Sequence, residues 1–266
     1  MSYLCAANQE ITSVKIKEII AALERIAPLP LQESYDNAGL QCGLTETEAS
    51  GALLCLDVTE AVLQEAVDLG CNLVVSHHPL LFHGLKQVSD ATLVERCLRM
   101  AIQNDICLYA AHTNLDNAED GVNYKIAEKL GLIDVQPLSP SGILGYLPEG
   151  EDSLAFLQRV KQAFHVEALQ HNQLLERPVQ SVAICGGAGD FILSAAIEAE
   201  ADAFLTGEMH YHTWFGHEQE IQIAVLGHYE SEQFTREIFR SVIEQTAPLL
   251  PVYDTTVCTN PILTLV

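Results

Sequence analysis

Two apolar segments far apart in the chain each end in imidazole side chains. Residues 73–76 run into the adjacent pair His77 and His78, and residues 223–226 run into a turn that carries His228. A buried strand fixes the backbone before each loop, and the loop lets its side chains face a cleft. Imidazole nitrogens are common metal ligands, so the two segments indicate a metal-binding site.

A proline follows the histidine pair and restricts its geometry. Pro79 biases His78 toward an extended backbone, and neighbouring side chains of an extended segment point to opposite sides. Two diverging imidazoles suit two metal ions better than one. The alternative is a pair of surface histidines with ordinary loop roles.

A carboxylate lies one helical turn after the third histidine. His228 and Glu232 are four residues apart, so on a helix they share one face. An imidazole and a carboxylate at the start of a helix are a common pair of metal ligands. The alternative is an ordinary hydrogen-bonded pair on a solvated helix.

A polar loop follows the predicted strand at 106–110. Within this loop, Asp116 could bridge two cations, and His112 could act as acid or base or bind substrate. Alternatively, Asn114 and Asp116 are simply turn formers. Three imidazoles and two carboxylates without a thiolate would suit Zn²⁺, Fe²⁺, Mn²⁺ or similar ions.

Two further predicted strand ends add polar groups. The glycine-rich turn at 185–190 could present backbone N–H groups to a phosphate, although it lacks the third glycine of the dinucleotide fingerprint and no Walker lysine is present. A plain tight turn is the alternative. Residues 206–212 contribute Glu208 and His212, which join His112 as candidates for proton transfer or else decorate a surface helix.

Helical and extended patterns alternate through almost the whole chain and must position these side chains. The patterns predict helices at 12–27, 60–69, 91–103, 121–130, 153–164, 190–200, 209–219 and 229–245, and strands at 51–58, 71–76, 106–110, 179–185, 203–206, 221–226 and 251–258. Thr12 or Ser13 would cap the first helix, and Pro28 would end it. Such alternation is typical of an α/β fold with parallel or mixed sheets covered by helices on both faces.

In sheets of this kind, binding sites form at the carboxyl ends of the strands. The pair His77 and His78, the loop at 111–116 and His228 all fall at such ends, so we expect one shared site. The stretch after residue 131 contains three prolines and is the predicted domain boundary.

The composition indicates a globular protein with a substantial core. The 266 residues are 48% hydrophobic, and 36 acidic residues against 13 basic ones give a net charge of −23. So acidic a chain repels phosphate backbones, which argues against nucleic acids and anionic membranes as partners. Eight cysteines without a CxxC pair suit buried thiols in a reducing compartment. No segment has the pattern of a signal peptide or a membrane span, so we expect a cytoplasmic protein.

The motifs, taken in order, resemble the NIF-three-like family, also called GTP cyclohydrolase I type 2 homologues or dinuclear metal-centre proteins. The resemblance covers nearly the whole chain. It rests on Tyr35-Asp36-Asn37-Ala38-Gly39-Leu40, Ser76-His77-His78-Pro79-Leu80-Leu81-Phe82, Ala111-His112-Thr113-Asn114-Leu115-Asp116 with Gly121-Val122-Asn123, the segments 182–189 and 201–208, and Gly227-His228-Tyr229-Glu230-Ser231-Glu232. Tyr35 stands where the family usually has tryptophan.

The resemblance implies a dinuclear metal centre in the cleft between two α/β domains. Its ligands would be His77, His78, Asp116, His228 and Glu232. The first domain would comprise residues 1–130 and 225–266, and the second would comprise residues 131–224. Members of the family are expected to form a hexameric ring. The chain lacks the inserted middle domain of longer members, so any function of that insert is in doubt here.

These features lead us to predict a metal-dependent hydrolase that uses two divalent cations and acts on a nucleotide such as GTP. For GTP, attack at the imidazole carbon of guanine would open that ring, with His112, Glu208 or His212 transferring protons. A non-catalytic metal carrier or adaptor is the alternative, because the chain is strongly acidic and has no lysine-rich phosphate clamp. A purely structural role for the metal is the third reading.

Overall fold

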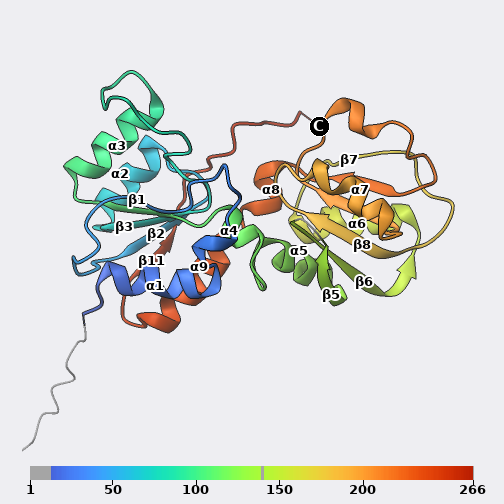
Figure 1. Ribbon diagram of the computed structural model, residues 1–266, viewed down its shortest axis with the longest axis horizontal. Helices are drawn as coiled ribbons and strands as arrows, with labels where there is room; N and C mark the ends of the chain where they lie inside the picture. Colours follow the sequence, from blue (N-terminus) through green and yellow to red (C-terminus); the bar gives the residue numbers. More distant parts are fainter. Residues whose placement is uncertain (1–12, 139–140, 266) are drawn as a thin grey trace, which may run out of the picture.

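The chain forms two α/β units, each built around one sheet, with short helices between them (Figure 1). The structure is a computed structural model that describes residues 13–138 and 141–265. The first sheet contains, in spatial order, β1 (Gly39–Cys42), β4 (Cys107–Ala110), β3 (Leu73–Ser76), β2 (Ala52–Cys55) and β11 (Val252–Asp254). All pairs in this sheet are parallel except β1 with β4, so the expected mixed sheet is confirmed.

Helices cover both faces of the first sheet, because its central strands are apolar on both sides. In β2, Leu53 and Cys55 face α2 (Glu60–Asp68) and α3 (Leu93–Gln103). Ala52 and Leu54 belong to the core on the other face, which includes buried residues of α1 (Ile16–Ile26) and α9 (Thr235–Thr246). All four residues of β2 are buried, as a strand covered on both faces requires.

The second sheet is also mixed. It contains, in order, β5 (Ile133–Leu138), β6 (Gly142–Glu151), β8 (Val179–Cys185), β9 (Ala203–Thr206), β10 (Gln222–Val225) and β7 (Gln170–His171). Strands β8, β9 and β10 are parallel, and the outer strands join them antiparallel. Helices α5 (Val122–Leu130) and α6 (Ser153–Phe164) belong to the core on one face, and α7 (Leu193–Glu198) belongs to the core on the other.

The expected division of the chain at residue 131 stays a prediction. Helix α5 lies before that point, yet it packs against α6, β6 and β8 of the second unit (Figure 1). The hydrophobic core also continues from one unit into the other, through Leu115, Ala118 and Val122. The two units are therefore joined by shared apolar packing as well as by the chain.

Several element predictions were wrong in type or extent. The loose stretch after Gly131 is the hairpin of β5 and β6, and Pro137 is tolerated because β5 is an edge strand. The expected helix at 209–219 reduces to the 3₁₀ turn η3 (Tyr211–Trp214), since Gly216 and Gln219 adopt positive φ angles of 85° and 60°. The strands β1 and β7 were not predicted.

Helix boundaries also differ from the expectation. The predicted helix at 229–245 is divided into α8 (His228–Glu232) and α9, and the predicted loop after β4 contains the short helix α4 (Thr113–Asp116). The first helix begins at Ile16, and the hydroxyl of Ser13 bonds to Glu48 instead of capping it. Thr12 lies outside the described residues.

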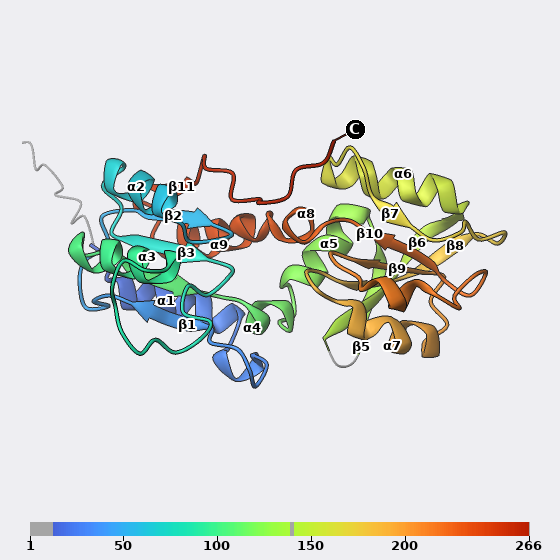
Figure 2. The same cartoon turned by 90° about the horizontal axis from the view of Figure 1, so that it is seen from above.

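The carboxyl ends of the parallel strands in the two sheets, β2 to β4 in the first and β8 to β10 in the second, meet in the region of α4 and α8 (Figures 1 and 2). The chain then crosses between the units a last time, because the segment after β11 returns from the first unit to the second (Figure 2). In the described part of the chain, no helix has the length and apolar character needed to cross a membrane.

Candidate metal centre

His77 follows β3 directly and is fully buried. Its Nδ1 atom lies 2.8 Å from the carbonyl oxygen of Ala111, which can only accept a hydrogen bond. The proton therefore belongs on Nδ1, and Nε2 keeps its lone pair. Nε2 is buried and has no hydrogen-bond partner among the described residues, whereas buried polar atoms ordinarily have one.

His78 points its two nitrogens at two carboxylates. Nδ1 lies 2.7 Å from Oδ1 of Asp57, a residue just after β2, and Nε2 lies 3.0 Å from Oε2 of Glu232. Metal-binding histidines commonly have such a carboxylate on the far nitrogen, where it fixes the ring orientation. The predicted divergence of the pair is only partial. His77 and His78 belong to separate groups of donor atoms that share Glu232, but together with His112 they also form a third such group.

Helix α8 contributes His228 and Glu232 on one face, as their spacing predicts. His228 Nε2 lies 3.1 Å from Oε2 of Glu232 and 3.3 Å from Nε2 of His78. The other nitrogen of His228, Nδ1, lies 2.8 Å from Oε1 of Glu208, so a second carboxylate orients a second imidazole.

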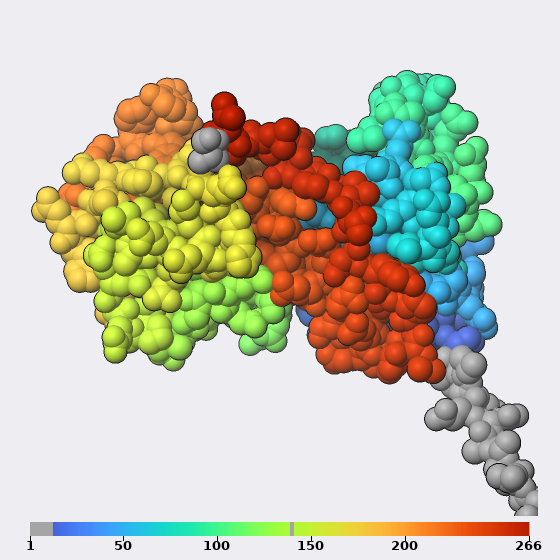
Figure 3. All heavy atoms as spheres, turned by 180° about the vertical axis from the view of Figure 1, so that it is seen from behind, coloured from blue at the N-terminus to red at the C-terminus, as the bar shows by residue number. Residues whose placement is uncertain are grey.

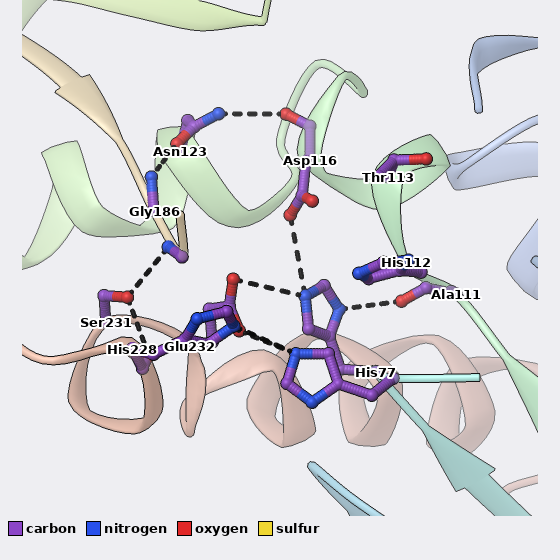
Figure 4. Close-up of polar contacts among 12 residues, drawn as sticks. His77, Ala111, His112, Thr113, Asp116, Asn123, Gly186, His228, Ser231 and Glu232 are labelled. Carbon is purple, nitrogen blue, oxygen red and sulfur yellow. Dashed lines mark hydrogen bonds and ion pairs between the residues drawn. The ribbon is translucent and has the colours of Figure 1, made fainter. Parts of the chain in front are cut away.

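Glu232 stands between two groups of donor atoms (Figure 4). Its Oε2 atom is shared with His78 and His228, while its Oε1 atom lies 3.6 Å from Nε2 of His77. Asp116 completes the second group, with Oδ1 3.7 Å from the same nitrogen. Within each group the donor atoms lie within 4.8 Å of one another, close enough to hold one cation.

The unpartnered atoms of the second group fit a cation. Oδ1 of Asp116, like Nε2 of His77, is buried without a hydrogen-bond partner among the described residues. One positive ion between them would satisfy both. The carboxylate and imidazole donors suit Zn²⁺, Mn²⁺ or Fe²⁺, and these contacts contain no thiolate.

Protons on the imidazoles offset the buried carboxylates when no cation is bound. Burial opposes charge on His78, but its hydrogen bonds to Asp57 and Glu232 raise its pKa to about 10. His228 is likewise desolvated, yet its contact with Glu232 raises its pKa to about 9. Burial and the nearby charge of Glu232 raise the pKa of Asp116 well above its usual range. The buried carboxylates thus favour positive charge nearby, either as protons on the imidazoles or as a bound cation.

The three residues predicted to transfer protons occupy different environments. The His112 ring lies 5.3 Å from the His77 ring, and its Nδ1 lies 2.7 Å from Oδ1 of Asp36. Glu208 contacts Nδ1 of His228, one of the predicted ligands. His212 is exposed on η3, where its ring contacts Tyr211 and Phe215 instead of the centre.

Sequence reasoning gave no role to Asp57 or to Asp36, although Asp36 lies in the segment 35–40 that resembles the family. Asp57 lies within the predicted strand at 51–58, at the carboxyl end of β2, so applying the strand-end rule to that strand would have found it. Asp36 lies in an irregular segment and accepts hydrogen bonds from the backbone N–H and the hydroxyl of Thr113. No periodic pattern points to it.

The glycine-rich turn at 186–189 serves packing, which corrects the phosphate-binding reading. Its N–H groups donate to protein oxygens: Gly186 to Asn123, Gly187 to Ser231 and Gly189 to Thr206. A Cβ atom on Gly187 would lie 2.3 Å from Oε1 of Glu232, so only glycine lets the turn approach that carboxylate. The turn therefore supports the metal centre from the second unit.

Two cavities open beside the centre. One of about 240 Å³ is lined by His112, Asp116, His228 and Glu232, with the exposed aromatic rings of Tyr35 and Phe191 among its walls. The other, of about 690 Å³, lies beside His228 and Glu208 under the C-terminal residues. Neither cavity has a lysine or arginine among the described residues that line it.

Relatives of known sequence cover most of the chain. A protein named GTP cyclohydrolase 1 type 2 homolog from Clostridium perfringens is 34% identical over 228 residues, which are 82% of this chain and 87% of that protein. NIF3-like protein 1 of Drosophila melanogaster is 32% identical over 213 residues, 74% of this chain and 70% of that protein.

Solved structures share the fold. The Bacillus cereus protein related to NIF3 has a TM-score of 0.86 at 23% identity, covering 95% of this chain and 99% of that one. Reduced HcgD from Methanocaldococcus jannaschii has a TM-score of 0.80 at 26% identity, covering 93% and 100%. The family described as Duf34/NIF3 (NGG1p interacting factor 3) matches residues 14–261. The chain therefore belongs to the Duf34/NIF3 family, as its motifs predicted.

Proposed function

We propose that this protein binds two divalent cations and uses them to hydrolyse a nucleotide. The single observation that carries the proposal is the position of the Glu232 carboxylate, whose oxygens face His77 on one side and both His78 and His228 on the other. A carboxylate shared by two groups of donor atoms would let the two groups hold neighbouring cations. The names of the relatives as GTP cyclohydrolase homologues suggest the substrate class.

Different residues would have different roles in such a site. His77, His78, Asp116, His228 and Glu232 would hold the cations, and Asp57 and Glu208 would orient two of the imidazoles. Bound divalent cations supply Lewis acidity that activates water near neutral pH. His112 is held at Nδ1 by Asp36, so its Nε2 is the atom left to exchange a proton with a substrate in the smaller cavity.

A metal-loading and turnover experiment tests this function. Protein purified without chelator should contain two divalent cations per chain, and the loaded protein should turn over GTP or another member of a nucleotide panel. A His77→Ala, His78→Ala double variant should lose both properties. Metal-loaded protein without turnover on any nucleotide or phosphoester would contradict the hydrolase and leave metal binding standing.

A metal carrier or adaptor is the second candidate, and one observation favours it. The described residues that line the two cavities include no lysine or arginine, so a triphosphate would meet no side-chain cation there. A carrier should pass its metal to an acceptor protein, and variants of the ligands should lose this transfer. Turnover at a steady rate without net loss of metal would argue for the hydrolase instead.

Assembly and location belong to the same proposal. We propose a homohexameric ring, as the family resemblance implies, and a cytoplasmic location, as the sequence patterns and the cysteines without a CxxC pair led us to expect. Light scattering on purified protein tests the assembly, and a mass of one or two chains would contradict the ring.

A further inference from the structure

The segment after β11 crosses from the first unit to the second (Figure 3). It is anchored at its start, where the hydroxyls of Thr255 and Thr256 both donate to Glu65 on α2. At its far end, Ile262, Leu263 and Thr264 line the larger cavity. The part between, residues 257–261, therefore spans the region where the ligands of the two units meet.

Thr259 holds the carboxylate that orients His78. Its hydroxyl donates to Oδ2 of Asp57 at 2.7 Å, while Oδ1 of the same carboxylate lies 2.7 Å from Nδ1 of His78. With both oxygens engaged, the Asp57 carboxylate cannot turn without breaking one of these bonds. The orientation of a metal ligand in the first unit thus depends on a hydroxyl near the end of the chain.

The next residue contacts the other side of the centre. Asn260 Nδ2 donates to Oε1 of Glu230 at 2.7 Å, and Glu230 lies on α8 between His228 and Glu232. The second oxygen of Glu230 lies over Gly227, where a Cβ atom would be 2.1 Å away. Asn260 therefore fixes Glu230 against Gly227, the residue just before α8.

Pro261 supports this arrangement, because a residue before proline favours an extended backbone and an extended chain reaches both contacts. Two consecutive side chains face opposite sides of an extended segment. Thr259 and Asn260 accordingly reach Asp57 in the first unit and Glu230 on α8.

We propose that Thr259 and Asn260 form a clamp that positions the donor group of His78, His228 and Glu232. This inference rests on the proposed binding of two cations. Thr259 and Asn260 act through Asp57 and Glu230, which contact His78 and α8 but neither His77 nor Asp116. We therefore expect the clamp to act on the cation position of His78 and His228 more than on the other. Thr259 and Asn260 are positioning residues, since they act on the ligands through Asp57 and Glu230.

A Co²⁺ titration tests the clamp, with d–d absorption reporting the ligand field of each bound ion. Thr259→Val keeps the side-chain shape and removes the hydroxyl. It should weaken one of two Co²⁺ equilibria about 10-fold and change its spectrum, as loss of a supporting hydrogen bond at a metal ligand typically does. Thr259→Ser, which keeps a hydroxyl, should retain the wild-type Co²⁺ affinity and spectrum. Asn260→Leu should weaken the same Co²⁺ equilibrium as Thr259→Val.

Thr256→Val is the matched control, because it removes a neighbouring hydroxyl that bonds to Glu65 instead of Asp57. It should bind both ions as the wild type does. If Thr256→Val and Thr259→Val lowered Co²⁺ affinity equally, the clamp would be contradicted. The effect would then come from the packing of the whole segment. If Thr259→Val bound both Co²⁺ ions with unchanged affinity, the clamp would also be contradicted, but the proposed function would still stand. Wild-type protein that takes up no Co²⁺ would overturn both.

Discussion

Glu232 faces His77 with one carboxylate oxygen, at 3.6 Å, and His78 with the other, at 3.0 Å. The histidines are adjacent in sequence, and the carboxylate comes from α8, between the two units. One side chain therefore completes two groups of donor atoms that the end of β3 alone would leave incomplete. If these groups hold cations, metal binding depends on the contact between the units.

Substitution of the shared carboxylate should affect both cation positions. In Glu232→Gln, one oxygen becomes an amide nitrogen and the charge is lost, so the metal content should fall toward zero. Asp116 belongs to one donor group only, and Asp116→Asn should keep one cation. Elemental analysis after dialysis checks both variants, and equal losses in the two would argue against a shared ligand.

The close approach of Gly187 to Glu232 predicts that a side chain at this position lowers both stability and metal affinity. Gly187→Ala places a methyl group 2.3 Å from Oε1 of Glu232 at a φ of 58°, so it should lower both the unfolding free energy and metal affinity. The backbone strain alone should cost about 1–2 kcal/mol, and crowding should add about 1–3 kcal/mol. Chemical denaturation and metal titration measure the two losses.

Gly70→Ala is the control for that variant. Its φ of 70° imposes similar strain, but a Cβ atom there meets nothing within 4 Å. It should lose only the strain contribution and bind metal normally. If Gly70→Ala and Gly187→Ala were equally stable and bound metal alike, the close approach of the turn to Glu232 would be disproved.

The raised pKa values of two ligands predict a pH dependence of metal binding. Without cations, His78 has a pKa of about 10 and His228 of about 9, so both are protonated at neutral pH. A metal ion must displace these protons, so affinity should rise with pH through neutrality. Calorimetry in buffers of different ionisation enthalpy should show proton release, and buffer-independent heats would contradict it.

The stability of the metal-free protein should change in the opposite direction. A histidine whose pKa is raised by folding stabilises the native state fully below its unfolded pKa, about 6.5. That contribution disappears as the pH passes through about 9 for His228 and about 10 for His78. Melting curves of chelator-treated protein should therefore shift to lower temperature between neutral and alkaline pH. An unchanged or rising midpoint would contradict this.

The sequence predicted correctly which residues converge where polar side chains directly follow a predicted strand. His77, His78 and His228 each follow a buried apolar run, and His228 and Glu232 share a helix face, so their convergence could be inferred from local patterns. The structure brings these residues and Asp116 together as expected. Their role as ligands stays a prediction.

Other features depend on contacts that no local pattern encodes. The bonds from Thr259 to Asp57 and from His112 to Asp36 join residues far apart in the chain. The predicted helix at 209–219 had suitable spacing, but tertiary packing replaced it with turns around a glycine of positive φ. His212 was proposed as a site residue because it follows the predicted strand at 203–206, and it lies exposed instead.

His112, which contacts Asp36, could either transfer protons or bind a metal ion. Variants of these two residues distinguish the two roles. If His112 transfers protons, His112→Gln should keep two cations and lower turnover about 10²–10⁴-fold. Asp36→Asn should lower turnover less, because the imidazole remains but its orientation and basicity change. His171→Gln is the control, since this exposed imidazole contacts only the carbonyl of Asn172 among the described residues. Metal content and turnover measured together decide the matter, because loss of a cation from His112→Gln would make His112 a ligand.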